Sequence, residues 1–331
     1  MNITVLSDGG WGTSLANVLC DNGNKVTMWG PFPDYIEEMK ETRENSRFLK
    51  GYPLPESLIL EGDIEKALEN TELILLASPS QFLRSTLDQL KPFYDKNTPI
   101  VNVAKGIEND TLLRMSELCS NVLGECNFAV LSGPSHAEEV VKKVPTLVVV
   151  ASKNETTAET VKKAFMNDYL RIYTSDDVIS VELGGALKNV MAVAAGIIDG
   201  MQLGDNPKAA LITRGIAEMA RLGVALGGDN KTFSGLSGIG DMIVTCASGH
   251  SRNRFVGEEL GKGRSLEDIT SEMGMVVAEG VKTSKSAYEL AKKINIEVPI
   301  INEVYEVLYN GKNSKTAVYD LMTRKSKGEF E

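Results

Sequence analysis

The sequence has few of the residues that build metal centres and nucleophilic triads. Its 331 residues include only 4 cysteines and 2 histidines. The cysteines stand at positions 20, 119, 126 and 246, with no Cys-x-x-Cys pair among them, so neither a zinc site nor a disulfide framework is indicated. We therefore expect no metal site, and free thiols of the kind kept in a reducing cytoplasm.

A basic excess and a membrane-spanning run are lacking too. Lysine and arginine number 35 against 45 acidic residues, a formal net charge of −10, and a field of this sign opposes nucleic acid and anionic membranes. The most apolar run, residues 190–198, is far shorter than the roughly 20 residues of a membrane span. The first residues predict no signal peptide. We expect a cytoplasmic protein that inserts into no membrane, with any phosphate ligand held by a local cluster of cations.

The sequence does contain enough apolar mass for a sizeable core. Hydrophobic residues make up 42% of the chain, although aromatic residues make up only 6%, and this excludes intrinsic disorder. At roughly 150 residues per domain, the length suggests about two domains. The hydrophobic pattern changes near residue 180, which predicts one domain over residues 1–180 and a second over residues 181–331.

In the first of these domains, short strand-like runs alternate with helical segments. The predicted strands are residues 3–6, 26–29, 73–77, 100–104, 128–131 and 146–151. The predicted helices are residues 11–20, 34–42, 81–90, 111–123 and 156–167. This alternation is typical of a mostly parallel sheet covered by helices on both faces. The N-terminal half is therefore predicted to be a doubly wound, Rossmann-type α/β domain.

The second half carries helical periodicity with few strand signals. Its predicted helices are residues 178–201, 208–226, 253–261, 266–273, 282–294 and 300–309. We expect an all-helical C-terminal domain, entered through the first of these helices.

A glycine-rich turn follows the first predicted strand and opens the first predicted helix. Gly9 and Gly12 fill the last two glycine positions of the G-x-G-x-x-G pattern, and Ser7 takes the first. In that pattern, backbone N–H groups at the start of the helix hold a dinucleotide pyrophosphate. Because glycine alone adopts positive φ freely, we expect Ser7 to strain or reshape the turn. The acid or arginine that would distinguish NAD from NADP is missing after Trp29, so the cofactor preference stays open.

Four charged residues stand out as candidates for chemistry on a phosphorylated carbonyl compound. Lys105 follows a predicted strand, where ligands bind in doubly wound folds. Lys188 lies in a helix that is apolar on nearly all sides, where a lysine is costly unless it is paired or deprotonated. Asp241 stands among glycines and could pair with Lys188, and Arg252 near a helix start suits a phosphate.

These segments resemble the bacterial type of NAD(P)-dependent glycerol-3-phosphate dehydrogenase along nearly the whole chain. The resemblance rests on the motifs GGWGT at 9–13, AKGIE at 104–108, SGPSHA at 132–137, ELGGALKNV at 182–190, LSGIGD at 236–241, SRN at 251–253 and VAEG at 277–280. It departs from the family at Ser7 and Gly10, where glycine and serine are usual, and at Pro31, where the family often has a basic residue that favours a 2′-phosphate.

The resemblance implies reversible hydride transfer between dihydroxyacetone phosphate and sn-glycerol 3-phosphate, with NAD or NADP as cofactor, supplying glycerol phosphate for phospholipid synthesis. It implies that Lys188 exchanges the proton at the substrate oxygen, and that the chain forms a homodimer. The implied substrate-binding residues are Lys105, Gly133, Ser135, Lys188, Asp241, Ser251, Arg252 and Asn253. The implied cofactor-binding residues are Gly10, Trp11, Lys105, Ala137, Arg252, Val277 and Glu279.

Two other functions remain open on the sequence alone. The chain could be a dinucleotide-binding sensor that kept the fold and lost activity through its changes at Ser7 and Gly10. It could also be a related dehydrogenase of a 2-hydroxy or 3-hydroxy acid, because an arginine fork binds a carboxylate as well as a phosphate.

Overall fold

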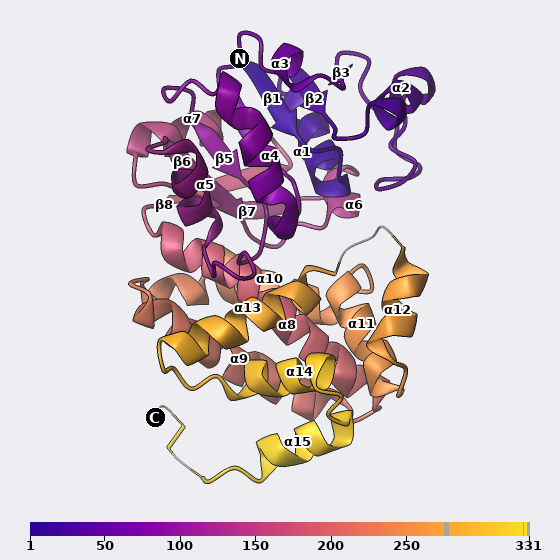
Figure 1. The fold of residues 1–331 in the computed structure, drawn as a ribbon, viewed down its shortest axis with the longest axis vertical. Helices are drawn as coiled ribbons and strands as arrows, with labels where there is room; N and C mark the ends of the chain where they lie inside the picture. The colour runs from indigo at the N-terminus through magenta and orange to yellow at the C-terminus, as the bar shows by residue number, and fades with distance from the viewer. Residues whose placement is uncertain (275–277, 327, 330–331) are drawn as a thin grey trace.

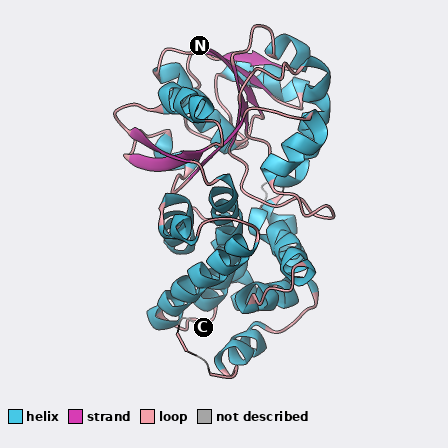
Figure 2. Ribbon diagram, turned by 90° about the vertical axis from the view of Figure 1, so that its left-hand side faces the viewer, coloured by secondary structure: helices cyan, strands magenta, loops and turns pink. Residues whose placement is uncertain are grey.

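The computed structural model consists of a sheet-containing half and a helical half (Figure 1). It describes residues 1–274, 278–326 and 328–329. The N-terminus lies at the outer end of the sheet half, and the described chain ends on the helical half, as Figure 2 shows from a second direction. The last strand ends at Ser175 and the next helix begins at Val178. The division into domains at residue 180 stays a prediction.

Within the described residues, eight strands form one sheet in the order β3-β2-β1-β4-β5-β6-β7-β8. Every neighbouring pair is parallel except β6 and β7, which are antiparallel. The strands are β1 (Asn2–Leu6), β2 (Lys25–Trp29), β3 (Ile59–Glu61), β4 (Leu73–Leu76), β5 (Ile100–Asn102), β6 (Phe128–Ser132), β7 (Thr146–Ala151) and β8 (Leu170–Ser175). The predicted doubly wound domain is confirmed, because apolar clusters lie on both faces of the sheet.

The helices of this half mostly follow the predicted segments. They are α1 (Gly10–Asp21), α2 (Pro33–Thr42), α3 (Ile64–Ala67), η1 (Ser80–Phe82), α4 (Leu83–Leu90), η2 (Lys91–Phe93), α5 (Met115–Leu123), α6 (Ala137–Val140) and α7 (Glu155–Phe165). The predicted start of a helix at residue 111 is wrong. Leu112 has φ of 62° and Arg114 forms a bridge to Ile107, so the helix begins only at Met115.

The described part of the helical half contains no strand, as predicted. Its elements are α8 (Val178–Gly200), α9 (Asp205–Ala225), η3 (Asn230–Ser234), the π-helical segment η4 (Leu236–Gly240), α10 (Asp241–Ala247), α11 (Arg252–Gly261), α12 (Leu266–Met273), α13 (Glu279–Lys293), α14 (Pro299–Tyr309) and α15 (Ser314–Met322). Helix α8 is long and apolar enough to cross a membrane, but 94% of its most apolar window is buried inside the protein. It is therefore the core helix around which the others pack.

Glycines allow α8 to lie very close to α11. A Cβ added at Gly196 would lie 1.9 Å from the backbone oxygen of Arg254, and one added at Gly257 would lie 1.9 Å from that of Val193. Any larger residue at either position would force the helices apart. This close contact holds the start of α11, with Arg252, beside the part of α8 that carries Lys188.

Candidate active site

A cleft of about 250 Å³ is lined by residues from both halves of the chain, at the predicted site. Its walls include Gly9, Gly10 and Trp11 from the glycine-rich turn, and Lys105 from the end of β5. From the helical half they include Lys188. The further predicted residues in its walls are Ser135, Ala137, Ser251, Arg252, Asn253 and Glu279. Most of the predicted site residues thus meet in one cleft, although they are spread over more than half of the chain.

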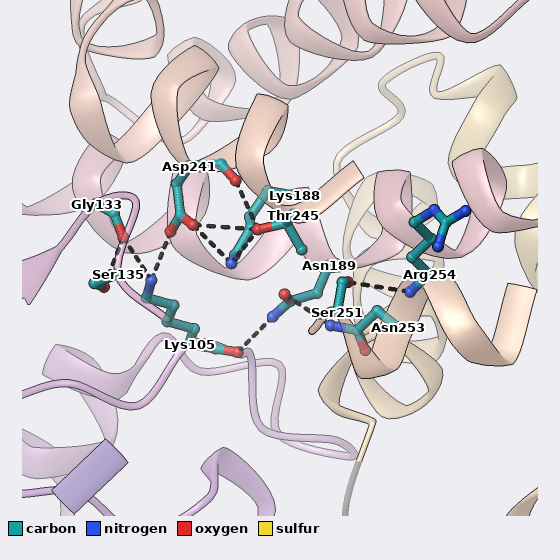
Figure 3. A network of polar contacts seen from close by, with 10 residues as sticks. All are labelled: Lys105, Gly133, Ser135, Lys188, Asn189, Asp241, Thr245, Ser251, Asn253 and Arg254. Carbon is teal, nitrogen blue, oxygen red and sulfur yellow. Dashed lines mark hydrogen bonds and ion pairs between the residues drawn. The ribbon is translucent and has the colours of Figure 1, made fainter. Parts of the chain in front are cut away.

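At one end of the cleft, two lysines share one aspartate (Figure 3). Lys188 Nζ donates to Asp241 Oδ1 at 2.8 Å and to Thr245 Oγ1 at 2.7 Å. Lys105 Nζ donates to Asp241 Oδ2 at 2.6 Å and to the backbone oxygen of Gly133 at 3.0 Å. The predicted pairing of Lys188 with Asp241 is confirmed, and Lys105 is a second cation on the same carboxylate.

Burial and charge set the protonation of this cluster. The side chain of Asp241 is 1% exposed and that of Lys188 is 8% exposed. Burial by itself raises the pKa of Asp241, but the charges and hydrogen bonds of Lys105 and Lys188 hold it below its ordinary value. Burial, together with the neighbouring charge of Lys188 and against the attraction of Asp241, lowers the pKa of Lys105 to about 8. At neutral pH the carboxylate of Asp241 is therefore ionised and Lys105 is protonated.

The backbone around the cluster requires glycine at two places. Gly133, directly after β6, has φ of 139°, and an added Cβ would lie 3.0 Å from Val148. This conformation turns its carbonyl oxygen toward Lys105 Nζ, and the same oxygen accepts a bond from Ser135 Oγ at 2.9 Å. Gly185 in α8 leaves room for the hydroxyl of Ser132, which would lie 2.8 Å from an added Cβ, beside the stem of Lys105, whose Cγ would lie 3.4 Å away. Gly133 and Ser135 thus help to place Lys105.

Arg252 lies at the start of α11, on the other side of the cleft. It is exposed, and none of the ion pairs among the described residues involves it. Arg254, two residues later, is bonded to Asp199 at 2.6 Å and faces Glu258 at 3.5 Å. Of these two arginines, Arg252 was the predicted phosphate ligand. In the structure Arg252 lines the cleft and forms none of the ion pairs among the described residues, with the charge of Glu279 nearby.

Ser251 and Asn253 support the chain around Arg252. The hydroxyl of Ser251 accepts the N–H of Arg254 at 3.2 Å and caps α11. Asn253 donates to the side chain of Asn189 at 3.0 Å and accepts the N–H of Gly280 at 2.8 Å. Both side chains are buried in the structure and line the cleft, so their roles here are to hold α11, α8 and the start of α13 together.

The glycine-rich turn is suited to a pyrophosphate. Helix α1 begins at Gly10, and no side chain caps its N-terminus by a hydrogen bond. Its first turn also contains no acidic residue. Its N-terminal amide groups therefore favour an anion. The indole Nε1 of Trp11 is buried without a partner among the described residues. A dinucleotide fits this part of the cleft.

The two departures from the family pattern have visible effects on this turn. Ser7 has φ of 130°, so the predicted strain at this position is confirmed. A Cβ added at Gly10 would lie 2.5 Å from the backbone oxygen of Phe48. A serine at position 10 would require the segment at Phe48 to move, and glycine is the residue that fits here.

Glu279 is another predicted cofactor-binding residue on the helical side. Its carboxylate accepts the N–H of Ser80 at 3.1 Å and the hydroxyl of the same residue at 2.5 Å. Burial raises its pKa, with those bonds and the charge of Arg252 acting in the opposite direction. It joins the start of α13 to the loop after β4. Val277 lies outside the described residues.

Three residues beside the cleft were not among the predicted site residues. The hydroxyl of Thr245 accepts a hydrogen bond from Lys188 Nζ. The side-chain amide of Asn189 donates to the backbone oxygen of Lys105 at 3.3 Å. His136 lines the cleft, and its Nε2 is buried without a partner among the described residues. Burial, with the charge of Lys188, lowers the pKa of His136. Thr245 lies four residues after Asp241, one helical turn away, and this spacing was the available signal.

The chain matches family models over most of its length. Residues 2–158 match the model described as the N-terminus of NAD-dependent glycerol-3-phosphate dehydrogenase. Residues 177–319 match the model described as the C-terminus of the same family.

Individual proteins agree with these models. The chain is 50% identical to a protein of Chlorobium phaeobacteroides named glycerol-3-phosphate dehydrogenase (NAD(P)+), covering 100% of this chain and 99% of that protein. It is 49% identical to the protein of that name from Bacillus velezensis, covering 99% and 96%. The crystal structure of glycerol-3-phosphate dehydrogenase from Coxiella burnetii superimposes with a TM-score of 0.94 at 37% identity, covering 98% of this chain and 99% of that one.

Proposed function

The chain belongs to the family of NAD-dependent glycerol-3-phosphate dehydrogenases, and on that premise we propose that it interconverts dihydroxyacetone phosphate and sn-glycerol 3-phosphate with NAD or NADP. The observation that carries the proposal is the position of Lys188. Its buried ammonium group lines the same cleft as the glycine-rich turn and Arg252. A proton donor, a dinucleotide site and a free cation therefore face one space.

Lys188 is the proposed catalytic residue. When bound, the nicotinamide cofactor supplies the hydride that the ketone carbon accepts. Lys188 Nζ then gives its proton to the ketone oxygen in reduction, and takes it back from the hydroxyl group in oxidation. Asp241 and Thr245 hold Nζ through bonds of 2.8 and 2.7 Å. These fixed partners orient the amine before the substrate arrives.

Arg252 and Lys105 are proposed to bind the substrate. The guanidinium of Arg252 and the N-terminus of α11 offer a phosphate a charged fork and a positive helix end. The phosphate contact lies away from the reacting carbon, so its binding energy can orient the ketone toward Lys188. Gly9, Gly10 and Trp11 are proposed to hold the cofactor pyrophosphate, and Ala137 and Glu279 to line its path along the cleft.

Initial rates of NADH and NADPH oxidation with dihydroxyacetone phosphate test the proposal. Saturable turnover with at least one cofactor is expected. Cofactor binding without oxidation would favour the sensor instead. Faster turnover of a 2-keto acid than of dihydroxyacetone phosphate would favour the related hydroxy-acid dehydrogenase, so a keto acid of similar size belongs in the same assay.

The homodimer, the cytoplasmic location and the supply of glycerol phosphate to phospholipid synthesis remain predictions. Each has a direct measurement: the mass in solution, the cell fraction that contains the protein, and the lipid content of cells that lack it.

A further inference from the structure

The end of β2 lacks an acidic residue, but an acidic side chain from elsewhere lies beside it. Rossmann-type domains that prefer NAD usually place an Asp or Glu at this point, where it binds the ribose 2′-hydroxyl. Here the strand ends at Trp29 and is followed by the buried Gly30. A Cβ added at Gly30 would lie 2.8 Å from Asp8 Oδ2 and 2.8 Å from Ile36 Cδ1. The carboxylate of Asp8 therefore fills the space from which a side chain at position 30 would start.

Asp8 is buried and incompletely bonded. It is 4% exposed, and its Oδ2 has no hydrogen-bond partner among the described residues. Burial raises its pKa, while its own backbone N–H and the charge of Arg47 act against this. A buried carboxylate oxygen without a donor is costly. Asp8 directly precedes Gly9, a residue in the wall of the cleft, and a ligand hydroxyl that reached its carboxylate from there would relieve that cost.

Arg47 is the cation whose charge acts on Asp8, but it is not free to neutralise the Asp8 carboxylate. Arg47 is paired with Glu38 at 3.3 Å, and its guanidinium lies 3.8 Å from the centre of the Tyr35 ring. Asp8, Glu38 and Arg47 together carry one excess negative charge. This group of side chains would repel the 2′-phosphate of NADP, which carries two negative charges, but would accept the neutral 2′-hydroxyl of NAD.

We propose that Asp8 replaces the acidic residue missing from the end of β2 and makes this protein prefer NAD to NADP. The proposal rests on the proposed function only in requiring a bound dinucleotide. Asp8 comes from the glycine-rich turn itself, so one turn both binds the pyrophosphate and selects the ribose. This explains how the chain can distinguish the cofactors although its second strand ends in Trp29-Gly30-Pro31.

Calorimetric titration with NADH and NADPH tests this without relying on activity. The unmodified protein is expected to bind NADH more tightly by about tenfold or more, the usual effect of one charged contact. Asp8→Asn keeps the shape and removes the charge, and should bring the two affinities to within about threefold of each other. Glu37→Gln removes the same charge from the exposed surface of α2 and should leave the ratio unchanged.

A second variant, which moves the acidic side chain to the end of β2, keeps the test valid even if the Asp8→Asn protein fails to fold. Asp8→Ala combined with Gly30→Asp moves the acid to the end of β2 and should restore the preference for NADH. Gly30→Asp alone should lower the melting temperature more than the double variant does, because the new side chain meets both Asp8 and Ile36, and only Asp8 is removed in the double variant. Equal binding of NADH and NADPH by the unmodified protein, or an unchanged ratio in Asp8→Asn, would overturn the inference and leave the proposed function standing. Binding of neither cofactor would overturn both.

Discussion

The two ends of the cleft treat charge in opposite ways. At the inner end, Lys188 and Asp241 are buried, Lys105 is partly buried, and each lysine is bonded to Asp241. At the outer end, Arg252 is exposed and forms none of the ion pairs found among the described residues. The comparison indicates that Lys188, proposed to move a proton, is held in place beforehand, whereas Arg252, proposed to capture the substrate phosphate, is left free. If so, mutation of Lys188 should mainly lower kcat and mutation of Arg252 should mainly raise KM.

Lys188→Met should have the largest effect. It keeps a stem of similar length and removes the ammonium group, so kcat should fall by about a thousandfold, within the range lost with a general acid. The affinity for NADH, measured by calorimetry, should stay within about twofold. Lys262→Met, which removes a lysine from an ion pair on α11, is the control and should keep normal turnover. A Lys188→Met enzyme with near-normal kcat would end the assignment of Lys188.

Arg252→Gln should act mainly on KM. Losing one charged contact to phosphate should raise the KM for dihydroxyacetone phosphate by about 10-fold to 100-fold, with a smaller change in kcat. Arg254→Gln is a matched control on the same helix turn. Because Arg254 is bonded to Asp199, its loss should lower the melting temperature and change KM little. Equal increases of KM in both variants would show that Arg252 has no special role in binding.

A smaller effect is expected on the pH dependence of kcat/KM, through Lys105 at the inner end. Burial lowers the pKa of Lys105 to about 8, so this lysine is protonated below pH 8 and loses its charge as the pH rises through that value. If the charge assists substrate binding, kcat/KM should decline above pH of about 8. Lys105→Arg keeps a charge at all accessible pH values, so its profile should lack this decline whatever its maximum. A decline at the same pH in Lys105→Arg would assign it to another group.

Ser7→Gly should have the smallest effect, and it acts on stability. Ser7 belongs to the glycine-rich turn and to neither of the two ends of the cleft compared above. The φ of 130° at Ser7 costs a non-glycine residue stability. Glycine should relieve this and raise the free energy of unfolding by about 1 kcal/mol, less whatever the bond from Gly9 N–H to Ser7 Oγ contributes. Chemical denaturation measures the change. A loss of stability would show that this hydrogen bond outweighs the backbone strain.

Much of the fold could be predicted from local pattern. Long apolar or amphipathic segments predicted the main strands and helices to within a few residues. The short strands β3 (Ile59–Glu61) and β8 (Leu170–Ser175) were missed. The first has three residues, and the second alternates exposed and buried positions beside a polar loop, so neither carries a strong apolar run. Their place in the sheet comes from pairing with β2 and β7.

The site could be predicted in its residues more than in its geometry. Lys188 stood out because a lysine in an apolar helix needs a partner, and Asp241 was the expected one. That Lys105 shares this aspartate depends on a contact across 136 residues of chain, which no local spacing reveals. Asp8 was read only as part of the glycine-rich turn, since its position beside Gly30 appears only when β1 and β2 are aligned.

The sequence by itself determined the alternation of the main strands and helices, the glycine-rich turn and the cost of a lysine in α8, because each follows from neighbours along the chain. Only the tertiary structure decided which cations share Asp241, which of Arg252 and Arg254 stays unpaired, and which acid stands beside the end of β2. These depend on how close distant segments approach, and that distance is set by the packing of the whole core.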